Sequence, residues 1–209
     1  MSPSMLAAPR RFPPSLILVA LIGLALSPAS TMADQPSANP TSLQFASGGT
    51  IRMKLNKGDM EVVGVADDRI KVSWHSTSAT DERRVKVRVQ RSGDRDATVS
   101  VDGPGDEMRY RIEVPRQSDL VIHMRAGELD VRGIAGSMDI DLMAGQMDLR
   151  LSDPARYRSV NASVTVGELD AKPWRADTGG LWRSFRMTGE GDYDLRARLI
   201  AGQLSIRTE

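Results

Sequence analysis

Apolar and polar residues alternate with a period of two along most of the chain, most regularly between residues 126 and 152. Residues 126–131, 135–140 and 144–149 each read A-G-x-[LM]-D-[VIL], so the row recurs every nine positions. Period-two alternation is typical of a strand with one buried face, and glycine is favoured at turns because it adopts positive φ without steric cost. The pattern predicts short strands, each led by a glycine, with the following side chains pointing inward: Leu129, Val131, Met138, Ile140, Leu142, Met147, Leu149 and Leu151.

Two rows make a circuit of eighteen residues, so successive circuits can stack as a parallel β-solenoid or β-roll. An antiparallel meander is the alternative, since a nine-residue spacing also suits hairpins, but near-identical rows favour the solenoid. Stacking the first row on the third places Asp130 beside Asp148, which is unfavourable for like charges. Arg132 and Arg150 lie two positions further on the same face and can relieve this repulsion diagonally.

Residues 42–115 hold further short alternating runs, separated by turn-like clusters such as Asn56-Lys57-Gly58-Asp59. Such runs, with a single helical turn expected at 80–84, predict an all-β chain. Pro115 ends this N-terminal β region, although the same core can continue through it. The predicted fold is therefore an N-terminal β region, 42–115, continuing into a C-terminal parallel β-solenoid of short Gly-led strands with a C-terminal cap, 116–209.

The first 41 residues predict export. Arg10 and Arg11 precede an apolar run at 16–26, and small residues follow in Thr31-Met32-Ala33. These are the three parts of a secretory signal peptide, residues 1–33, with cleavage after Ala33 or, alternatively, Ala29. The apolar run is well short of the ~20 residues that a membrane span needs, so we expect no span after cleavage. Residues 34–41 form a polar, flexible leader, and the mature protein is expected to be periplasmic or secreted.

Composition narrows the classes of function. The chain has no cysteine, which excludes disulfides, thiolate catalysis, cysteine-bound zinc and a bacterial lipoprotein anchor. Removing the predicted signal peptide with its two arginines takes the formal net charge from +1 to −1. Such a near-neutral balance of interspersed charges indicates no nucleic-acid partner.

The sequence matches the known metal-binding and catalytic motifs poorly. Calcium-binding β-rolls place aspartates in glycine-rich turns, whereas the aspartates here fall within the strands and face solvent. The two histidines, His75 and His123, are expected to face outward, and no G-x-S-x-G elbow or phosphate-binding loop is present. We therefore expect no catalytic, cofactor or metal residues, and a chain that is not an enzyme.

The candidate partner-binding residues lie in an insertion at 172–186, which carries Trp174, Trp182 and Phe185 with Arg183 among them. Exposed rings can stack on sugars, and the flanking arginines can meet acidic glycans. The alternative is structural: these large residues form a hydrophobic cap that closes the last coil, which a repeat array needs.

The A-G-x-Φ-D-Φ rows, the strand Tyr110-Arg111-Ile112-Glu113-Val114-Pro115 before them and the signal peptide resemble the bacterial putative-adhesin family over about residues 45–206. That family comprises exported β-solenoid domains of largely unassigned function, and it has no known catalytic residues to carry over. The resemblance implies an exported, non-catalytic, adhesin-like interaction module at the surface or in the periplasm, with an envelope or surface polymer or protein as partner. The alternatives are a periplasmic carbohydrate-active enzyme on a β-helix scaffold and a periplasmic carrier of an apolar ligand.

Overall fold

The computed structural model describes residues 39–105 and 107–209. The predicted signal peptide and most of the predicted leader lie outside these residues. Within them, no helix has the length and apolar character to cross a membrane.

The described chain is all-β, as predicted. One short helix, α1 (Ala79–Arg84), occupies the predicted helical turn, and the Ser78 hydroxyl caps it by accepting from the Asp81 backbone N–H at 3.3 Å. Two 3-10 turns follow at Pro154–Arg156 and Lys172–Trp174. The strands are β1 (Thr41–Gln44), β2 (Thr50–Val65), β3 (Arg69–His75), β4 (Lys86–Arg91), β5 (Asp96–Asp102), β6 (Arg109–Pro115), β7 (Asp119–Arg132), β8 (Met138–Leu151), β9 (Tyr157–Ala171), β10 (Ala176–Thr188) and β11 (Tyr193–Thr208).

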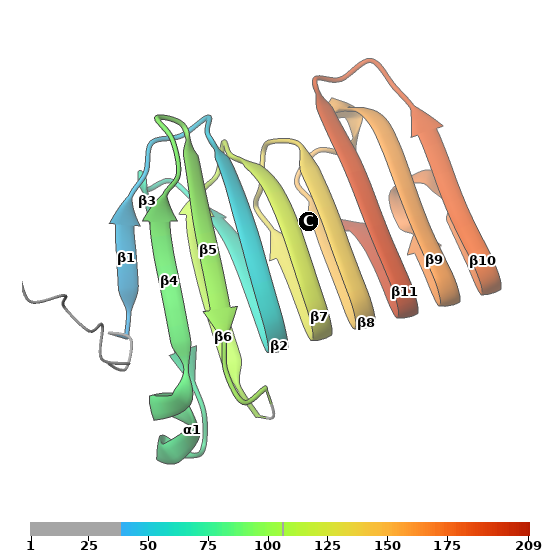
Figure 1. The fold of residues 1–209 in the computed structure, drawn as a ribbon. Helices are drawn as coiled ribbons and strands as arrows, with labels where there is room; N and C mark the ends of the chain where they lie inside the picture. The colour runs from blue at the N-terminus through green and yellow to red at the C-terminus, as the bar shows by residue number, and fades with distance from the viewer. Residues whose placement is uncertain (1–38, 106) are drawn as a thin grey trace, which may run out of the picture. The chain divides into compact units, whose positions relative to one another are not determined.

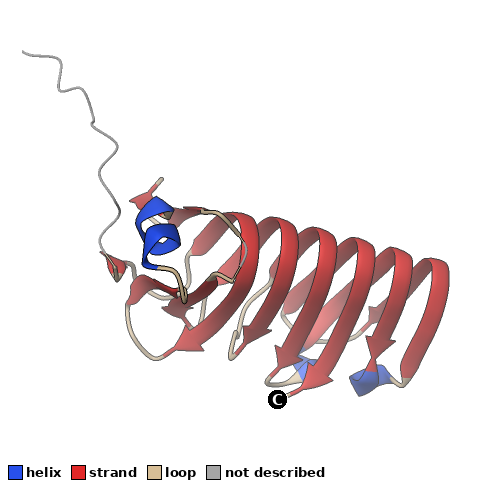
Figure 2. Ribbon diagram, turned by 90° about the horizontal axis from the view of Figure 1, so that it is seen from below, coloured by secondary structure: helices blue, strands red, loops and turns tan. Residues whose placement is uncertain are grey.

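Strands β2, β7, β8, β9 and β11 are long, 14 to 16 residues each, and curve as they cross the sheet (Figure 2). Each contains a glycine with positive φ, and these glycines stack across the sheet. At Gly145, φ is 132°, and a Cβ would lie only 1.9 Å from the carbonyl oxygen of Gly127 on the neighbouring strand. Because only glycine fits so close to another backbone, the strands bend together at this line. The stacked glycines are Gly58, Gly127, Gly145, Gly202 and Gly167.

Each bend divides a long strand into two arms. The first arm of β2 pairs with β5 and its second arm pairs with β6, whereas β7 pairs with both arms. The sheet therefore folds over at the bends, and alternate side chains of both arms enter a core between its layers. All eight side chains predicted to point inward are buried there. The core is one cluster that runs from Phe45 to Ile206 and draws on both predicted regions.

The sheet is mixed, so the parallel stack predicted for residues 116–209 needs correction at β10. Strands β2, β7, β8, β11 and β9 pair in parallel, in that order. At one end of the sheet, β10 runs antiparallel to β9. At the other end, β3 runs antiparallel to both β1 and β6, and β4 runs antiparallel to β5. In the parallel part Asp130 pairs with Asp148, so the first row stacks on the third with the eighteen-residue register that the sequence predicts.

The last strand lies inside the sheet and not at its end. β11 pairs in parallel with β8 on one side and with β9 on the other, and Leu195 has Met138 and Val160 as its two partners (Figure 1). The segment predicted to be an insertion forms most of β10, which lies at the outer edge beyond β9. Hydrogen bonding along both edges of β11 secures the C-terminal segment within the sheet.

Candidate interaction surface

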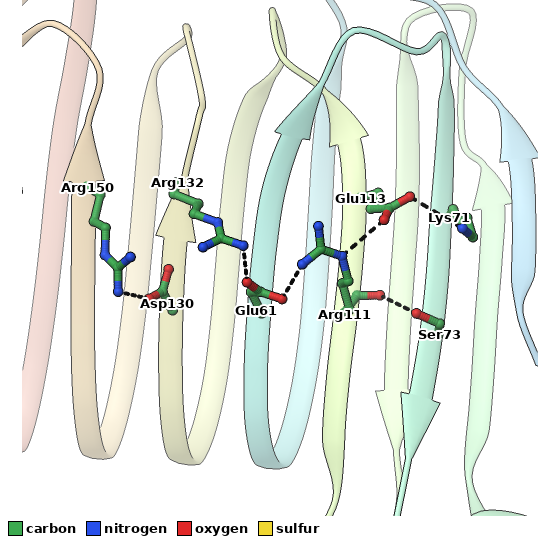
Figure 3. A network of polar contacts seen from close by, with 8 residues as sticks. All are labelled: Glu61, Lys71, Ser73, Arg111, Glu113, Asp130, Arg132 and Arg150. Carbon is green, nitrogen blue, oxygen red and sulfur yellow. Dashed lines mark hydrogen bonds and ion pairs between the residues drawn. The ribbon is translucent and has the colours of Figure 1, made fainter. Parts of the chain in front are cut away.

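The outward charges of the second arms are largely paired with one another (Figure 3). Arg111 on β6 donates to Glu61 on β2 at 2.5 Å and to Glu113 at 3.0 Å, and Lys71 on β3 lies 3.6 Å from Glu113. The hydrogen bond from Arg111 lowers the pKa of Glu113. Arg132 on β7 donates to the other oxygen of Glu61, so this chain of charges spans four strands.

The stacked aspartates continue the same face. Arg150 donates to Asp130 at 2.7 Å and lies 3.9 Å from Asp148, which is the diagonal relief that the sequence predicts for this arginine. Arg132 turns instead toward Glu61. Burial raises the pKa of Asp130, the charge of Asp148 adds to this rise, and Arg150 opposes it. A face whose charges already satisfy one another offers few unpaired ions to a partner.

A hollow of about 450 Å³ lies beside this network, lined by Glu61, Trp74, His75, Arg109 and Tyr110 among others. His75 is exposed, and its Nδ1 lies 2.9 Å from Glu82. His123 lies on β7, lines a different hollow, and has its Nδ1 3.1 Å from Asp141. Both histidines face outward, as predicted, and they do not come together. Among residues 39–105 and 107–209, no group of three or more His, Asp or Glu side chains is placed to hold a metal ion.

The structure separates the four candidate partner-binding residues. Trp174 stacks on Phe185, with ring centroids 5.5 Å apart and an interplanar angle of 24°, and both rings pack against the core. Arg183 is half-buried, and its Nε is enclosed without a hydrogen-bond partner. Trp182 is 80% exposed. The stacked pair of Trp174 and Phe185 packs on the core as the predicted hydrophobic cap would. Of the three rings, only that of Trp182 is largely exposed to solvent.

Trp182 belongs to a row of exposed apolar side chains at the bends of four neighbouring strands. Leu181 is 63% exposed, Met143 55%, Ile200 53% and Val166 49%. In the register of the sheet, Ala144 of β8 pairs with Ala201 of β11, Ala201 with Val166 of β9, and Val166 with Leu181 of β10. The row is thus continuous across β8, β11, β9 and β10. We call it the bend ridge, and it comprises Met143, Ile200, Val166, Leu181 and Trp182.

The bend ridge is confined to the C-terminal strands. At the equivalent bend, β7 carries the exposed Arg125 level with Met143, and β2 carries the half-buried Asn56 followed by the exposed Lys57. The surface therefore changes along one line from basic to apolar. Contiguous exposed apolar patches are a common feature of interaction surfaces.

Sequence reasoning named Trp182 but missed the other members of the bend ridge, although a signal for them exists. Met143 directly follows the inward Leu142, and Ile200 directly follows the inward Leu199, so the apolar–polar alternation breaks at both places. Each pair stands immediately before an Ala-Gly. Because successive side chains of a strand point to opposite faces, an apolar residue directly after an inward one lies on the outer face.

No protein-family model matches the sequence, and no curated protein does. Among solved structures, a putative cell adhesion protein from Clostridium sporogenes matches 82% of this chain and 100% of its own, with 12% identity and a TM-score of 0.50. This match shows a shared fold. A putative adhesin from Bacteroides fragilis has 13% identity over 85% of this chain and 100% of its own, with a TM-score of 0.28. One from Parabacteroides distasonis has 12% identity over 80% of this chain and 69% of its own, also with a TM-score of 0.28.

Proposed function

We propose that the mature chain is an exported, adhesin-like interaction module that acts by association and not by turnover, with a polymer or protein of the bacterial envelope as its partner. The observation that carries this proposal is the bend ridge. Its five large apolar side chains, each at least 49% exposed, form one row on a rigid sheet. Burying such side chains against a partner contributes about 25 cal/mol per Å² of apolar surface. In the described chain this part of their surface is left exposed to solvent.

The scaffold supports the same function. The stacked parallel strands with equivalent residues in register are, we propose, turns of a β-solenoid closed by the β9–β10 pair. The fold shared with the Clostridium sporogenes protein, a putative cell adhesion protein, supports an adhesin-like role for this chain in the periplasm or at the surface.

Two further observations favour association over the alternatives. A carbohydrate-active enzyme needs titratable groups that converge in a cleft, whereas His75 and His123 line different hollows and each faces its own carboxylate. A carrier of an apolar ligand needs an open cavity lined by inward residues, whereas the inward side chains of the long strands pack against one another in one continuous core.

The test is a binding measurement on the mature protein, residues 34–209, with isolated cell envelopes of the producing bacterium in a sedimentation assay. Met143→Ser combined with Ile200→Ser removes apolar area from the bend ridge. We expect this variant to bind about tenfold more weakly or worse, and to keep its melting temperature because both side chains are exposed.

Arg125→Ser is the matched control, since it changes an exposed side chain at the same bend position on β7. It should retain binding. If the double variant binds envelopes as tightly as the unmodified protein, the bend ridge is not the binding surface. Turnover of glycan or ester substrates that disappears with His75→Ala or His123→Ala would replace association by catalysis.

A further inference from the structure

The outer edge of β10 is a long row of backbone groups with no partner strand among the described residues. β10 pairs with β9 along both arms, from Ala176 opposite Ala171 to Thr188 opposite Ser159, with only Trp182 at the bend outside the register. Its other edge has no neighbour in the sheet order. An edge of 13 residues is a template for pairing with another chain, because each strand residue carries a main-chain donor and acceptor.

The opposite end of the sheet is protected in a way that β10 is not. There β1 has only four residues, and β4 has six and follows directly on helix α1. Very short strands are one of the usual means of blocking an edge. The two ends are therefore dissimilar, which disfavours head-to-tail stacking of copies and leaves pairing of β10 with an equivalent strand.

The bend determines which strand can pair along the whole edge. β10 follows the line of bends, with Gly180 opposite Gly167 and Leu181 opposite Val166. A straight peptide matches only one arm of such a strand, whereas a second β10 running antiparallel, with its bend on the first bend, matches both. This pairing has two-fold symmetry, and its axis passes close to Leu181.

The charges of β10 suit this symmetric register. Arg183 and Arg186 both follow the bend, so antiparallel pairing places each of them opposite residues 176–180 of the other copy and not opposite each other. The sequence of that segment, ADTGG, has one acid and no base. Like charges are therefore kept apart across the junction.

We propose that the protein forms a two-fold symmetric dimer in which β10 of one copy pairs antiparallel with β10 of a second copy, bend against bend. Leu181 and Trp182, the two most exposed apolar side chains of the bend ridge, then lie at the centre of the interface, where apolar anchors contribute most. The two bend ridges join into one row through the axis. The dimer does not depend on the proposed function, but it places Met143, Ile200 and Val166 of two copies on one particle, which strengthens binding to a repetitive partner through multivalency.

The absence of cysteine from the chain allows a direct test with the mature protein. Leu181→Cys places a thiol beside its own copy at the axis, so mild oxidation should give a disulfide-linked dimer. Ile200→Cys, on the same ridge but two strands from the edge, should cross-link far more slowly. Equal rates for the two variants would overturn the proposal.

Analytical ultracentrifugation gives a second, independent reading. The unmodified protein should sediment as a dimer, and Leu181→Asp should raise the dimer dissociation constant at least about 100-fold, because like charges meet at the axis. Leu181→Lys should raise the dimer dissociation constant in the same way. Mixing the two variants should restore a dimer, because the Asp of one copy then meets the Lys of the other, and this result requires residue 181 to face its equivalent across the axis. Met143→Asp is the control on the ridge away from the edge and should remain dimeric.

A protein that sediments as a monomer, a dimer that survives Leu181→Asp, or pairing of β10 with a different protein would each overturn the proposal. Failure here is distinct from failure of the envelope function, because the monomeric Leu181→Asp variant retains Met143, Ile200 and Val166. Its binding to envelopes can still be compared with that of Met143→Ser/Ile200→Ser.

Discussion

Asp130 and Asp148 lie opposite each other on β7 and β8, and the cost of placing two carboxylates together is reduced by Arg150 between them. The reduction is incomplete, since burial raises the pKa of Asp130 and Asp148 adds to the rise. An acid whose pKa is raised on folding holds its proton more tightly in the folded chain than in the unfolded chain. Its ionisation at higher pH therefore lowers the free energy of unfolding.

We accordingly expect Asp130→Asn to stabilise the protein at neutral pH. The gain should be less than about 1 kcal/mol, because the amide oxygen can still accept a weaker hydrogen bond from Arg150. The difference from the unmodified protein should shrink as the pH falls through the raised pKa of Asp130, where the wild-type carboxyl is already neutral. Urea unfolding at neutral and acidic pH measures both quantities.

Glu113→Gln is the control of opposite sign. Arg111 lowers the pKa of Glu113, so this carboxylate contributes stability above its unfolded pKa and loses it as the pH falls through its folded pKa. Its replacement should destabilise the protein at neutral pH and have little effect in acid. A stabilising effect of Glu113→Gln, or a destabilising effect of Asp130→Asn at neutral pH, would contradict the charge arrangement in Figure 3.

At the scale of elements, the bends allow each long strand to serve both layers of the sheet. They depend on stacked glycines, because neighbouring backbones meet there with no room for a side chain. Gly145 lies between Gly127 of β7 and Gly202 of β11, and its would-be Cβ overlaps the Gly127 carbonyl. Both the positive φ and the close approach therefore require glycine at this position.

Gly145→Ala should destabilise the protein by about 3 kcal/mol or more, because the methyl group adds a clash with a backbone atom to the strain of positive φ. Ala144→Ser, one residue earlier and exposed at the same bend, is the matched control and should change the free energy of unfolding by less than about 0.5 kcal/mol. Denaturant unfolding of the two variants checks this. A tolerated alanine at position 145 would mean that the strands do not approach each other as closely as the register requires.

At the scale of the whole described chain, one core joins the N-terminal and C-terminal parts of the sheet. Pro115 is buried at the end of β6, which pairs with the second arm of β2, and β2 also pairs with β7 beyond the predicted boundary. The core is one contiguous cluster that contains residues from both 42–115 and 116–209. We therefore expect the two regions to unfold together.

Tryptophans at the two ends of the sheet can report on this. Trp174→Phe/Trp182→Phe leaves the buried Trp74 on β3, and Trp74→Phe leaves the two C-terminal rings. Within each variant, the midpoint by fluorescence should equal the midpoint by circular dichroism, as a cooperative transition requires. Distinct midpoints would make the two regions independent domains.

Several features follow from the sequence because they depend on neighbours along the chain. Period-two alternation decides which side chains point inward, and all eight predicted inward residues of the three rows are buried. The eighteen-residue register agrees with a circuit of two near-identical rows, which stacks Asp130 on Asp148 and Gly127 on Gly145. The helical turn at α1 follows from its cap at Ser78.

The place of β11 between β8 and β9, and with it the edge at β10 and the bend ridge, was decided only by the tertiary structure. Parallel pairing is made by backbone groups that every residue carries, so Leu195 fits beside Met138 as well as beside Val160. Similar repeats are therefore interchangeable as neighbours, and their order in the sheet cannot be read from their order in the chain. Met143 and Ile200, 57 residues apart, become adjacent at one bend only because β11 enters that position.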